Sequence, residues 1–187
     1  VRDYEKQTAL VTKQVTLSAA KGEDIERLAL LDPITELYNH RAFVKEPKAE
    51  LARAKRYKHP ASLVLLSVDG YDELAGQYGP LTAEAIQKIV SHAVRSALRE
   101  VDVAAKYNQW QYAVILPQTN AAGASLVGER IRLRVNSQAI NHNGQNFSVT
   151  ASIGVATFPD HANEYDVLIA CAIEALETAL LRGGDRV

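Results

Sequence analysis

The chain has 187 residues, 47% of them hydrophobic, which is enough for one full-sized globular domain with some residues to spare. Its formal net charge of −1 at pH 7 excludes a general electrostatic attraction for nucleic acid or for an anionic membrane. The single cysteine, Cys171, lies in an apolar run, and it excludes both an internal disulfide and a cysteine-based zinc site. No apolar run reaches the roughly 18 residues that a membrane-spanning helix needs, and the composition suits a reducing cytoplasm.

Residues 2–31 are charged, rich in alanine and free of proline, which predicts a helix. Leucines are spaced at multiples of seven residues, at Leu10, Leu17 and Leu31, as in a coiled-coil heptad. Polar residues interrupt this apolar stripe. A parallel coiled coil and a lone helix packed on the domain therefore explain the pattern about equally well. We expect residues 1–31 to form a helix or linker for signalling or dimerisation, giving a homodimer, and residues 32–187 to form the domain. Because residue 1 is not methionine, we expect a piece of a longer protein with other domains attached.

From Asp32 onward, helical and extended patterns alternate. Helices are predicted over 43–57, 80–101, 120–135 and 164–184, where apolar residues recur at helical spacing. Ala61–Val68 is apolar on both faces, which predicts a strand at the centre of a sheet. Further strands are predicted over 102–107 and 110–117, joined by a two-residue tip, and over 147–158 after an Asn-Gly turn. This order predicts an α/β (α+β) fold with a ferredoxin-like β-α-β-β-α-β core, an extra hairpin and the N-terminal helix.

The stretch "LDPITELYNHRAF" carries a spaced pattern made by Asp32, Thr35, Leu37, Asn39, Arg41 and Phe43. This pattern resembles the entry motif of GGDEF domains, the diguanylate cyclases that condense two GTP molecules into cyclic di-GMP. The resemblance continues through "LVLLSVDGYDELAGQYG", "VTASIGVATF" and "ALLRGGDRV", so that it covers nearly everything from Leu28 to Val187. It implies the nucleotidyl-cyclase-like fold of that family. It also aligns the hairpin tip "NQWQY" with the family's Gly-Gly-Asp/Glu-Glu-Phe signature.

The same resemblance implies that the family's metal ligands are replaced. Magnesium prefers carboxylate oxygens, and the family supplies one from the end of the first strand and one from the third signature residue. The degenerate positions are Ser67 and Asp69 at the strand end, and Asn108, Gln109, Trp110, Gln111 and Tyr112 in the signature. Only Asp69 keeps an acid there, so we expect neither magnesium nor another cofactor to bind.

The implied nucleotide contacts are altered as well. Ala75 and Glu84 stand where the family reads guanine with an asparagine and an aspartate, and Asp72 replaces a lysine that meets the triphosphate. Leu180 and Gly184 replace a lysine and an arginine near the C-terminus. We therefore expect a catalytically inactive domain that is not an enzyme, with an active diguanylate cyclase as the disfavoured alternative.

One further family feature is retained, an Arg-x-x-Asp pattern that ends five residues before the signature position. Arg99 and Asp102 are spaced to reach the same side near a helix end, where a guanidinium can donate to phosphate or to guanine O6 and N7. The carboxylate can accept from the guanine N1 and N2 groups. Arg130 matches an arginine that the family often adds from the following helix. The resemblance thus implies a cyclic di-GMP site of the inhibitory type, although an ordinary exposed ion pair explains the same pattern without a ligand.

The sequence as a whole predicts a signalling domain. It is either a cyclic di-GMP receptor, through Arg99, Asp102 and Arg130, or a ligand-free protein-interaction and dimerisation module. Trp110 either fills the emptied GTP cleft or contacts a partner. Cyclic di-GMP and attached or separate signalling domains are the expected partners, while nucleic acid and membrane contact by this fragment are not expected. A cytoplasmic location is expected.

Overall fold

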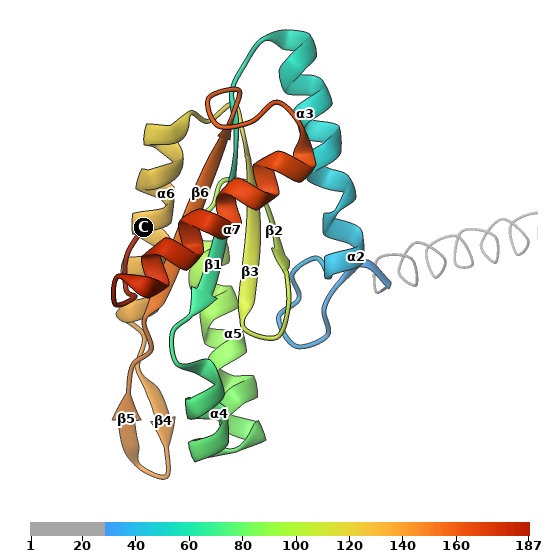
Figure 1. The fold of residues 1–187 in the computed structure, drawn as a ribbon. Coiled ribbons are helices and arrows are strands. Elements are labelled where there is room, and N and C mark those ends of the chain that lie inside the picture. The colour runs from blue at the N-terminus through green and yellow to red at the C-terminus, as the bar shows by residue number, and fades with distance from the viewer. Residues whose placement is uncertain (1–28) are drawn as a thin grey trace, which may run out of the picture.

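The computed structural model describes residues 29–187, which form a sheet covered by helices on both faces (Figure 1). The predicted N-terminal helix falls almost entirely in residues 1–28. That prediction, and the coiled coil and homodimer that depend on it, therefore lie outside the described residues. None of the helices between residues 29 and 187 combines the length and the hydropathy that a membrane crossing needs.

The centre of the domain is a four-stranded antiparallel sheet in the order β2-β3-β1-β6. Its strands are β1 (Ala61–Val68), β2 (Val103–Lys106), β3 (Gln111–Pro117) and β6 (Ala151–Phe158). Val64 of β1 lies opposite Val114 of β3 on one side and opposite Val155 of β6 on the other. Together with the helices between the strands, this arrangement confirms the ferredoxin-like core. Every residue of β1 is buried, as its two-sided apolar pattern predicts.

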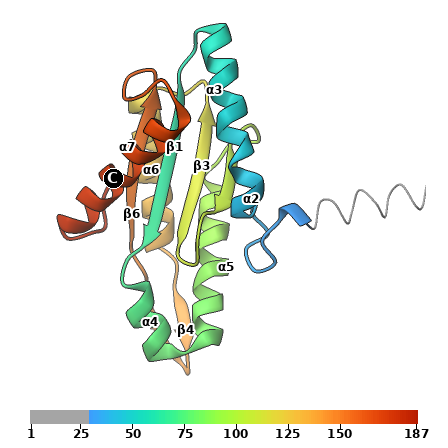
Figure 2. The same cartoon turned by 45° about the vertical axis from the view of Figure 1, so that its right-hand side comes forward.

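Six helices and a small hairpin surround this sheet in the described residues. They are α2 (His40–Phe43), α3 (Lys45–Tyr57), α4 (Tyr71–Tyr78), α5 (Pro80–Ser96), α6 (Ala121–Asn136) and α7 (Tyr165–Leu181), with the hairpin strands β4 (Ile140–His142) and β5 (Gln145–Phe147). One face of the sheet packs against α4, α5 and α6, and the other packs against α2, α3 and α7 (Figures 1 and 2).

Alternate residues of β1 enter two different parts of the core. Val64 and Leu66 pack with the side chains of α4, α5 and α6, whereas Leu63 and Leu65 pack with those of α3 and α7. Each fully buried side chain of this size contributes about 1.5–3 kcal/mol to folding. The sheet therefore has an apolar layer on each face, and β1 belongs to both.

Two helix predictions differ from the structure. The helix predicted to run to residue 101 ends at Ser96, because the residues that follow form a turn in which the Asp102 carboxylate accepts the backbone N–H of Arg99 at 2.8 Å. The short helix α4 was not predicted as a separate element. It lies between Gly70 and Gly79, whose φ angles of 63° and 82° give the chain the bends that begin and end it.

Two strand predictions also need correction. The tip of the β2-β3 hairpin is wider than the predicted Asn108-Gln109, because β2 ends at Lys106 and β3 begins at Gln111. The strand predicted over 147–158 begins only at residue 151, since residues 145–147 pair with β4 instead. The predicted Asn-Gly turn is confirmed, with φ angles of 50° at Asn143 and 84° at Gly144.

Candidate functional site

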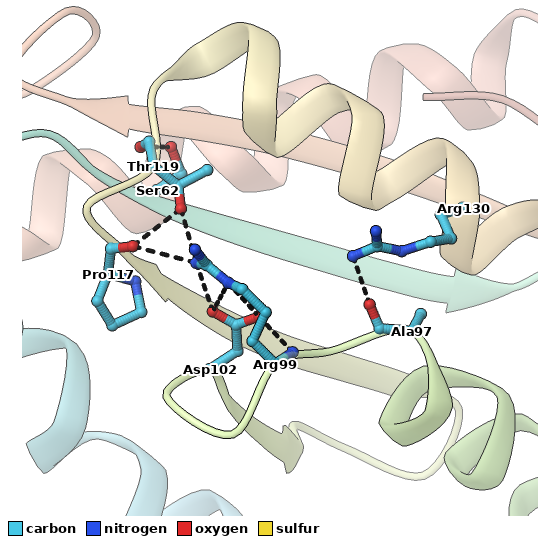
Figure 3. Close-up of polar contacts among 7 residues, drawn as sticks. All are labelled: Ser62, Ala97, Arg99, Asp102, Pro117, Thr119 and Arg130. Atoms are coloured by element: carbon cyan, nitrogen blue, oxygen red, sulfur yellow. Dashed lines mark hydrogen bonds and ion pairs between the residues drawn. The ribbon is translucent and has the colours of Figure 1, made fainter.

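Arg99 and Asp102 lie together in the turn between α5 and β2 (Figure 3). The carboxylate of Asp102 accepts hydrogen bonds from Nη2 of Arg99 at 2.8 Å, from its Nε at 3.3 Å and from its backbone N–H at 2.8 Å. The Asp102 side chain is 0% exposed, whereas that of Arg99 is 52% exposed. The hydrogen bond that Arg99 donates to Asp102 raises the pKa of Arg99 above its ordinary value. The pair therefore presents a permanent cation to solvent, while the enclosed carboxylate positions that cation and does not itself face a ligand.

A second set of contacts holds the same guanidinium from the other side. Nη2 of Arg99 also donates to the hydroxyl of Thr119 at 3.0 Å and to the carbonyl of Pro117 at 3.2 Å (Figure 3). Pro117 is the last residue of β3, and Thr119 lies in the loop that follows it before α6. Sequence reasoning missed them, because their approach to Arg99 depends on how a loop almost twenty residues further along the chain is folded.

Arg130 lies on the same side of the sheet but contacts the end of α5 (Figure 3). Its Nη2 donates to the carbonyl of Ala97 at 2.5 Å, and Arg134, one helical turn further along α6, donates to the carbonyl of Ser96. Two cations thus meet the negative end of a helix, where they are favourable. Arg134 was not predicted, although its spacing of four residues from Arg130 on one helix could have indicated it.

The strand end of β1 and the tip of the β2-β3 hairpin form a second polar region. A cavity of about 260 Å³ there is lined by the run Ser67 to Glu73 together with Trp110 and Leu180. The structure therefore brings together five predicted positions from three parts of the chain: Ser67, Asp69 and Asp72 after β1, Trp110 at the hairpin tip and Leu180 in α7.

Other predicted positions do not line this cavity. Ala75 packs on the core from α4, and Glu84 of α5 forms an ion pair with Lys88 at 2.7 Å. Gln109 is exposed at the hairpin tip. Gly184 lies on the far side of Asp69, and an added Cβ there would come within 3.1 Å of the carboxylate.

The carboxylate of Asp69 is fully engaged by the protein. Its Oδ1 accepts from the hydroxyl of Ser152 at 2.7 Å, and its Oδ2 accepts from the hydroxyl of Thr150 at 2.7 Å and from the backbone N–H of Asp185 at 3.0 Å. These partners were not predicted from sequence, because they come from the start of β6, from the residue before it and from the turn after α7. Asp69 consequently joins the end of β1 to the C-terminal turn.

The cavity residues do not fit a magnesium ion. Octahedral magnesium needs oxygen ligands that are free to coordinate it, usually including carboxylates. Ser67 supplies a hydroxyl, both oxygens of Asp69 already accept hydrogen bonds, and Asp72 and Glu73 are exposed on α4. Across residues 29–187, no group of three or more His, Cys, Asp and Glu side chains is arranged to hold a metal ion.

Trp110 turns inward and lies on Tyr71. The two rings are stacked, with centroids 5.7 Å apart and planes at 27°, and Trp110 packs against the core. The hydroxyl of Tyr71 accepts from Gln87 at 2.7 Å. Tyr112 is fully buried, its hydroxyl donates to the carbonyl of Gln87 at 3.2 Å, and burial raises its pKa. Neither ring is therefore free to form a large apolar surface for a partner.

The hairpin tip is organised by Asn108. Its side-chain oxygen accepts the backbone N–H groups of Gln111 at 3.0 Å and of Trp110 at 3.2 Å. Its amide nitrogen donates to the side-chain oxygen of Gln111 at 2.7 Å. No tip residue has a positive φ angle, so this loop has no need of the glycines that the family places there.

The sheet order and the placing of a strand-end acid beside a hairpin tip define a domain of the GGDEF type. The family described as "Diguanylate cyclase, GGDEF domain" matches residues 29–186. The chain belongs to this family, as its entry motif predicts.

Curated relatives and solved structures agree with this assignment. Diguanylate cyclase DosC of Escherichia coli (strain K12) is 31% identical over 179 residues, which are 95% of this chain and 39% of that protein. Diguanylate cyclase A of Treponema denticola is 26% identical over 188 residues, covering 99% of this chain and 51% of that protein. The chain thus spans only about half, or less, of the length of these relatives.

Two solved structures have the same fold as the described domain. Diguanylate cyclase SiaD of Pseudomonas aeruginosa, in complex with its activator SiaC, has a TM-score of 0.83 at 26% identity and covers 99% of this chain and 71% of its own. The coiled coil and GGDEF domain of DgcB from Caulobacter crescentus, in complex with c-di-GMP, has a TM-score of 0.88 at 24% identity and covers 98% of this chain and 97% of its own.

The prediction that the chain is not an enzyme is contradicted by these relatives, several of which are named as diguanylate cyclases. That prediction rested on individual replacements such as Ser67 and Trp110. Such replacements change where a metal can be held, but they do not by themselves decide whether the domain belongs to an enzyme. The family points to an enzymatic class.

Proposed function

We propose that this GGDEF domain binds cyclic di-GMP through Arg99, with Asp102 positioning the guanidinium and Arg130 at the edge of the site. The observation that carries the proposal is a half-exposed guanidinium held from behind by a fully buried carboxylate. Cyclic di-GMP offers two phosphodiesters and two guanine bases, and a guanidinium N–H can donate to either group. The DgcB structure contains c-di-GMP, which supports the same class of ligand here.

The surroundings of Arg99 favour an anion. Arg130 and Arg134 place two more guanidinium groups at the end of α5, where they donate to the carbonyls of Ala97 and Ser96. The one acid in direct contact with Arg99, Asp102, is buried and offers no exposed negative charge. A dianionic ligand therefore meets a cluster of cations that are already ordered by the protein, which lowers the entropy cost of binding.

Isothermal titration calorimetry with cyclic di-GMP tests this function. We expect saturable heat from the wild-type chain and at least a tenfold weaker affinity for Arg99→Ala. Arg182→Ala is the matched control, because Arg182 is an exposed arginine that follows α7, on the opposite face of the sheet. Absence of heat from the wild type at high micromolar ligand, or equal affinity of the Arg99→Ala protein, would refute the proposal.

We further propose that this binding needs no metal, in keeping with the poor fit of the cavity residues to magnesium. The same titration is therefore run with magnesium and with a chelator, and equal dissociation constants are expected. An affinity that falls when magnesium is removed would show that a metal takes part.

Synthesis of cyclic di-GMP from GTP is a second candidate function, favoured by relatives that are named as diguanylate cyclases. The purified chain is incubated with GTP and magnesium, and the nucleotides are separated by chromatography. Accumulation of cyclic di-GMP would establish synthesis, and unchanged GTP would remove this candidate while leaving the receptor proposal to the calorimetry.

A protein-interaction role is favoured by the SiaD structure, which contains an activator protein. We propose that the chain also forms a homodimer through residues 1–31 and works in the cytoplasm beside other signalling domains. Light scattering of the 187-residue chain tests the dimer, and a monomeric mass at micromolar concentration would contradict it.

A further inference from the structure

The loop between β3 and α6 turns back sharply beside Arg99. Gln118 has a φ angle of 49°, in the left-handed region that brings the chain round within one residue. The hydroxyl of the next residue, Thr119, can then donate to the carbonyl of Pro117 at 2.9 Å. Since a hydroxyl has one proton, this bond leaves its lone pairs free for the N–H of Arg99, which approaches to 3.0 Å (Figure 3).

The loop is fixed to the interior of the sheet. The backbone carbonyl of Thr119 accepts from the hydroxyl of Ser62 at 2.8 Å, and Ser62 in turn bonds the hydroxyl of Thr157 at 2.7 Å. Both of these residues are 0% exposed, on neighbouring strands β1 and β6. A buried polar pair holds one geometry when all its groups are satisfied, so this pair, near the ends of β1 and β6, anchors the backbone of Thr119 to the sheet.

We propose that Thr119 is a positioning residue for the cyclic di-GMP site: its hydroxyl holds the Arg99 guanidinium ready for the ligand. This inference rests on the proposed function and goes beyond it, because it assigns a role to a residue outside the Arg-x-x-Asp pattern. Asp102, Thr119 and the Pro117 carbonyl together occupy Nε and Nη2 of Arg99. Among the described residues Nη1 makes no hydrogen bond, and it is the nitrogen left to the ligand. A guanidinium held in this way loses less entropy on binding than a free one.

Calorimetry with three variants tests the role of the hydroxyl. Thr119→Val keeps the shape of the side chain and removes the hydroxyl, and we expect its affinity for cyclic di-GMP to fall about tenfold. Thr119→Ser restores the hydroxyl and should bind within about twofold of the wild type. Thr178→Val is the control, because Thr178 is exposed on α7 and its hydroxyl only donates to the carbonyl of Glu174. Equal affinity of wild type and Thr119→Val would overturn the inference.

Nuclear magnetic resonance of the arginine side chains gives a readout that needs no ligand. We expect separate Nη proton signals for Arg99 in the wild type and in Thr119→Ser, because the hydrogen bonds slow rotation of the Nη2 group. Exchange between these signals should become faster in Thr119→Val, which keeps only the Nη2 bonds to Asp102 and to the Pro117 carbonyl, and Arg99→Lys identifies the signals by their loss. Unchanged signals in Thr119→Val would refute positioning by Thr119, whereas slowed rotation in a wild type that binds no cyclic di-GMP would refute only the proposed function.

Discussion

Three aspartates in this domain act on the backbone around them. Asp102 holds the turn after α5, Asp69 ties the end of β1 to the C-terminal turn, and Asp32 organises the loop that leads into α2. The side chain of Asp32 accepts from the backbone N–H of Thr35 and from its hydroxyl, both at 2.8 Å. Two of the residues that identify the family by sequence therefore have a structural role, since they form one local hydrogen-bonded loop.

The charge of Asp32 gives the domain a pH dependence that can be measured. Burial raises the pKa of Asp32, but hydrogen bonds from Thr35 and Ile34 and the ammonium of Lys106 outweigh it and lower the pKa below the ordinary value of 3.8. A lowered carboxyl pKa contributes stability that is complete above the unfolded-state value and is lost as the pH falls through the folded-state value. We expect Asp32→Asn to cost about 1 kcal/mol in the free energy of unfolding at pH 7.

Urea unfolding at pH 7 and at about pH 3 checks this expectation. The difference between Asp32→Asn and the wild type should shrink at the lower pH, which lies below the ordinary value of 3.8, because protonation of Asp32 in the unfolded chain then removes part of the stabilisation. Asp72→Asn serves as the control, because Asp72 is exposed in the first turn of α4. A difference that stays the same at both pH values would show that the charge of Asp32 contributes nothing.

Among the helices and strands, bounds are predicted best where a single residue pattern determines the element. Strand β1 has the predicted bounds, because an unbroken apolar run suits only a strand buried on both faces. The predicted end of α5 was wrong. Apolar residues continue at helical spacing to Val101, but the hydrogen bond from the Arg99 N–H to the Asp102 carboxylate stabilises a turn after Ser96. The predicted start of β6 was wrong as well. Residues 145–147 pair with β4, and no local sequence pattern reveals which segments pair.

At the candidate site too, the local contact was predicted from the sequence and the long-range contacts were not. The spacing of Arg99 and Asp102 correctly predicted that they meet, since a separation of three residues at a helix end is a local matter. It did not reveal that the Asp102 side chain is fully buried, nor that Thr119 contacts the same guanidinium. The burial of Asp102 and the contact between Thr119 and Arg99 depend on how the whole domain packs, so they cannot be predicted from local sequence patterns.

The packing of α7 on β6 depends on one glycine. A Cβ at Gly154 would lie 2.2 Å from the carbonyl oxygen of Ala172 and 2.4 Å from the backbone nitrogen of Leu176, both in α7. These are backbone atoms of a helix, so they cannot move away independently. We therefore expect Gly154→Ala to destabilise the domain by more than about 3 kcal/mol or to prevent folding.

Thermal unfolding monitored by circular dichroism measures this effect. Gly76→Ala is a matched control, because Gly76 lies in α4 and nothing comes within 4 Å of an added Cβ. That variant should gain up to about 1 kcal/mol from helix propensity. A Gly154→Ala protein as stable as the wild type would mean that α7 can move away from β6 without cost.

Residues 29–187 as a whole form two apolar layers that share one sheet. Leu65 and Phe158 belong to the layer under α3 and α7, while Trp110 and Tyr71 belong to the layer under α4 and α5. Because β1 supplies side chains to both layers, neither layer can lose its packing while the other keeps a native sheet. The domain should therefore unfold as one cooperative unit, as small single domains usually do.

The single tryptophan makes this cooperativity testable. Leu65 is 1% exposed, and we expect Leu65→Ala to lower the free energy of unfolding by about 2–5 kcal/mol. Trp110 lies across the sheet from this change, so its fluorescence reports on the layer that was left intact. If the layers unfold together, fluorescence and circular dichroism give the same lowered urea midpoint. A fluorescence midpoint that stays at the wild-type value would show that the α4 and α5 layer survives alone, and the shared strand would then not couple the two halves.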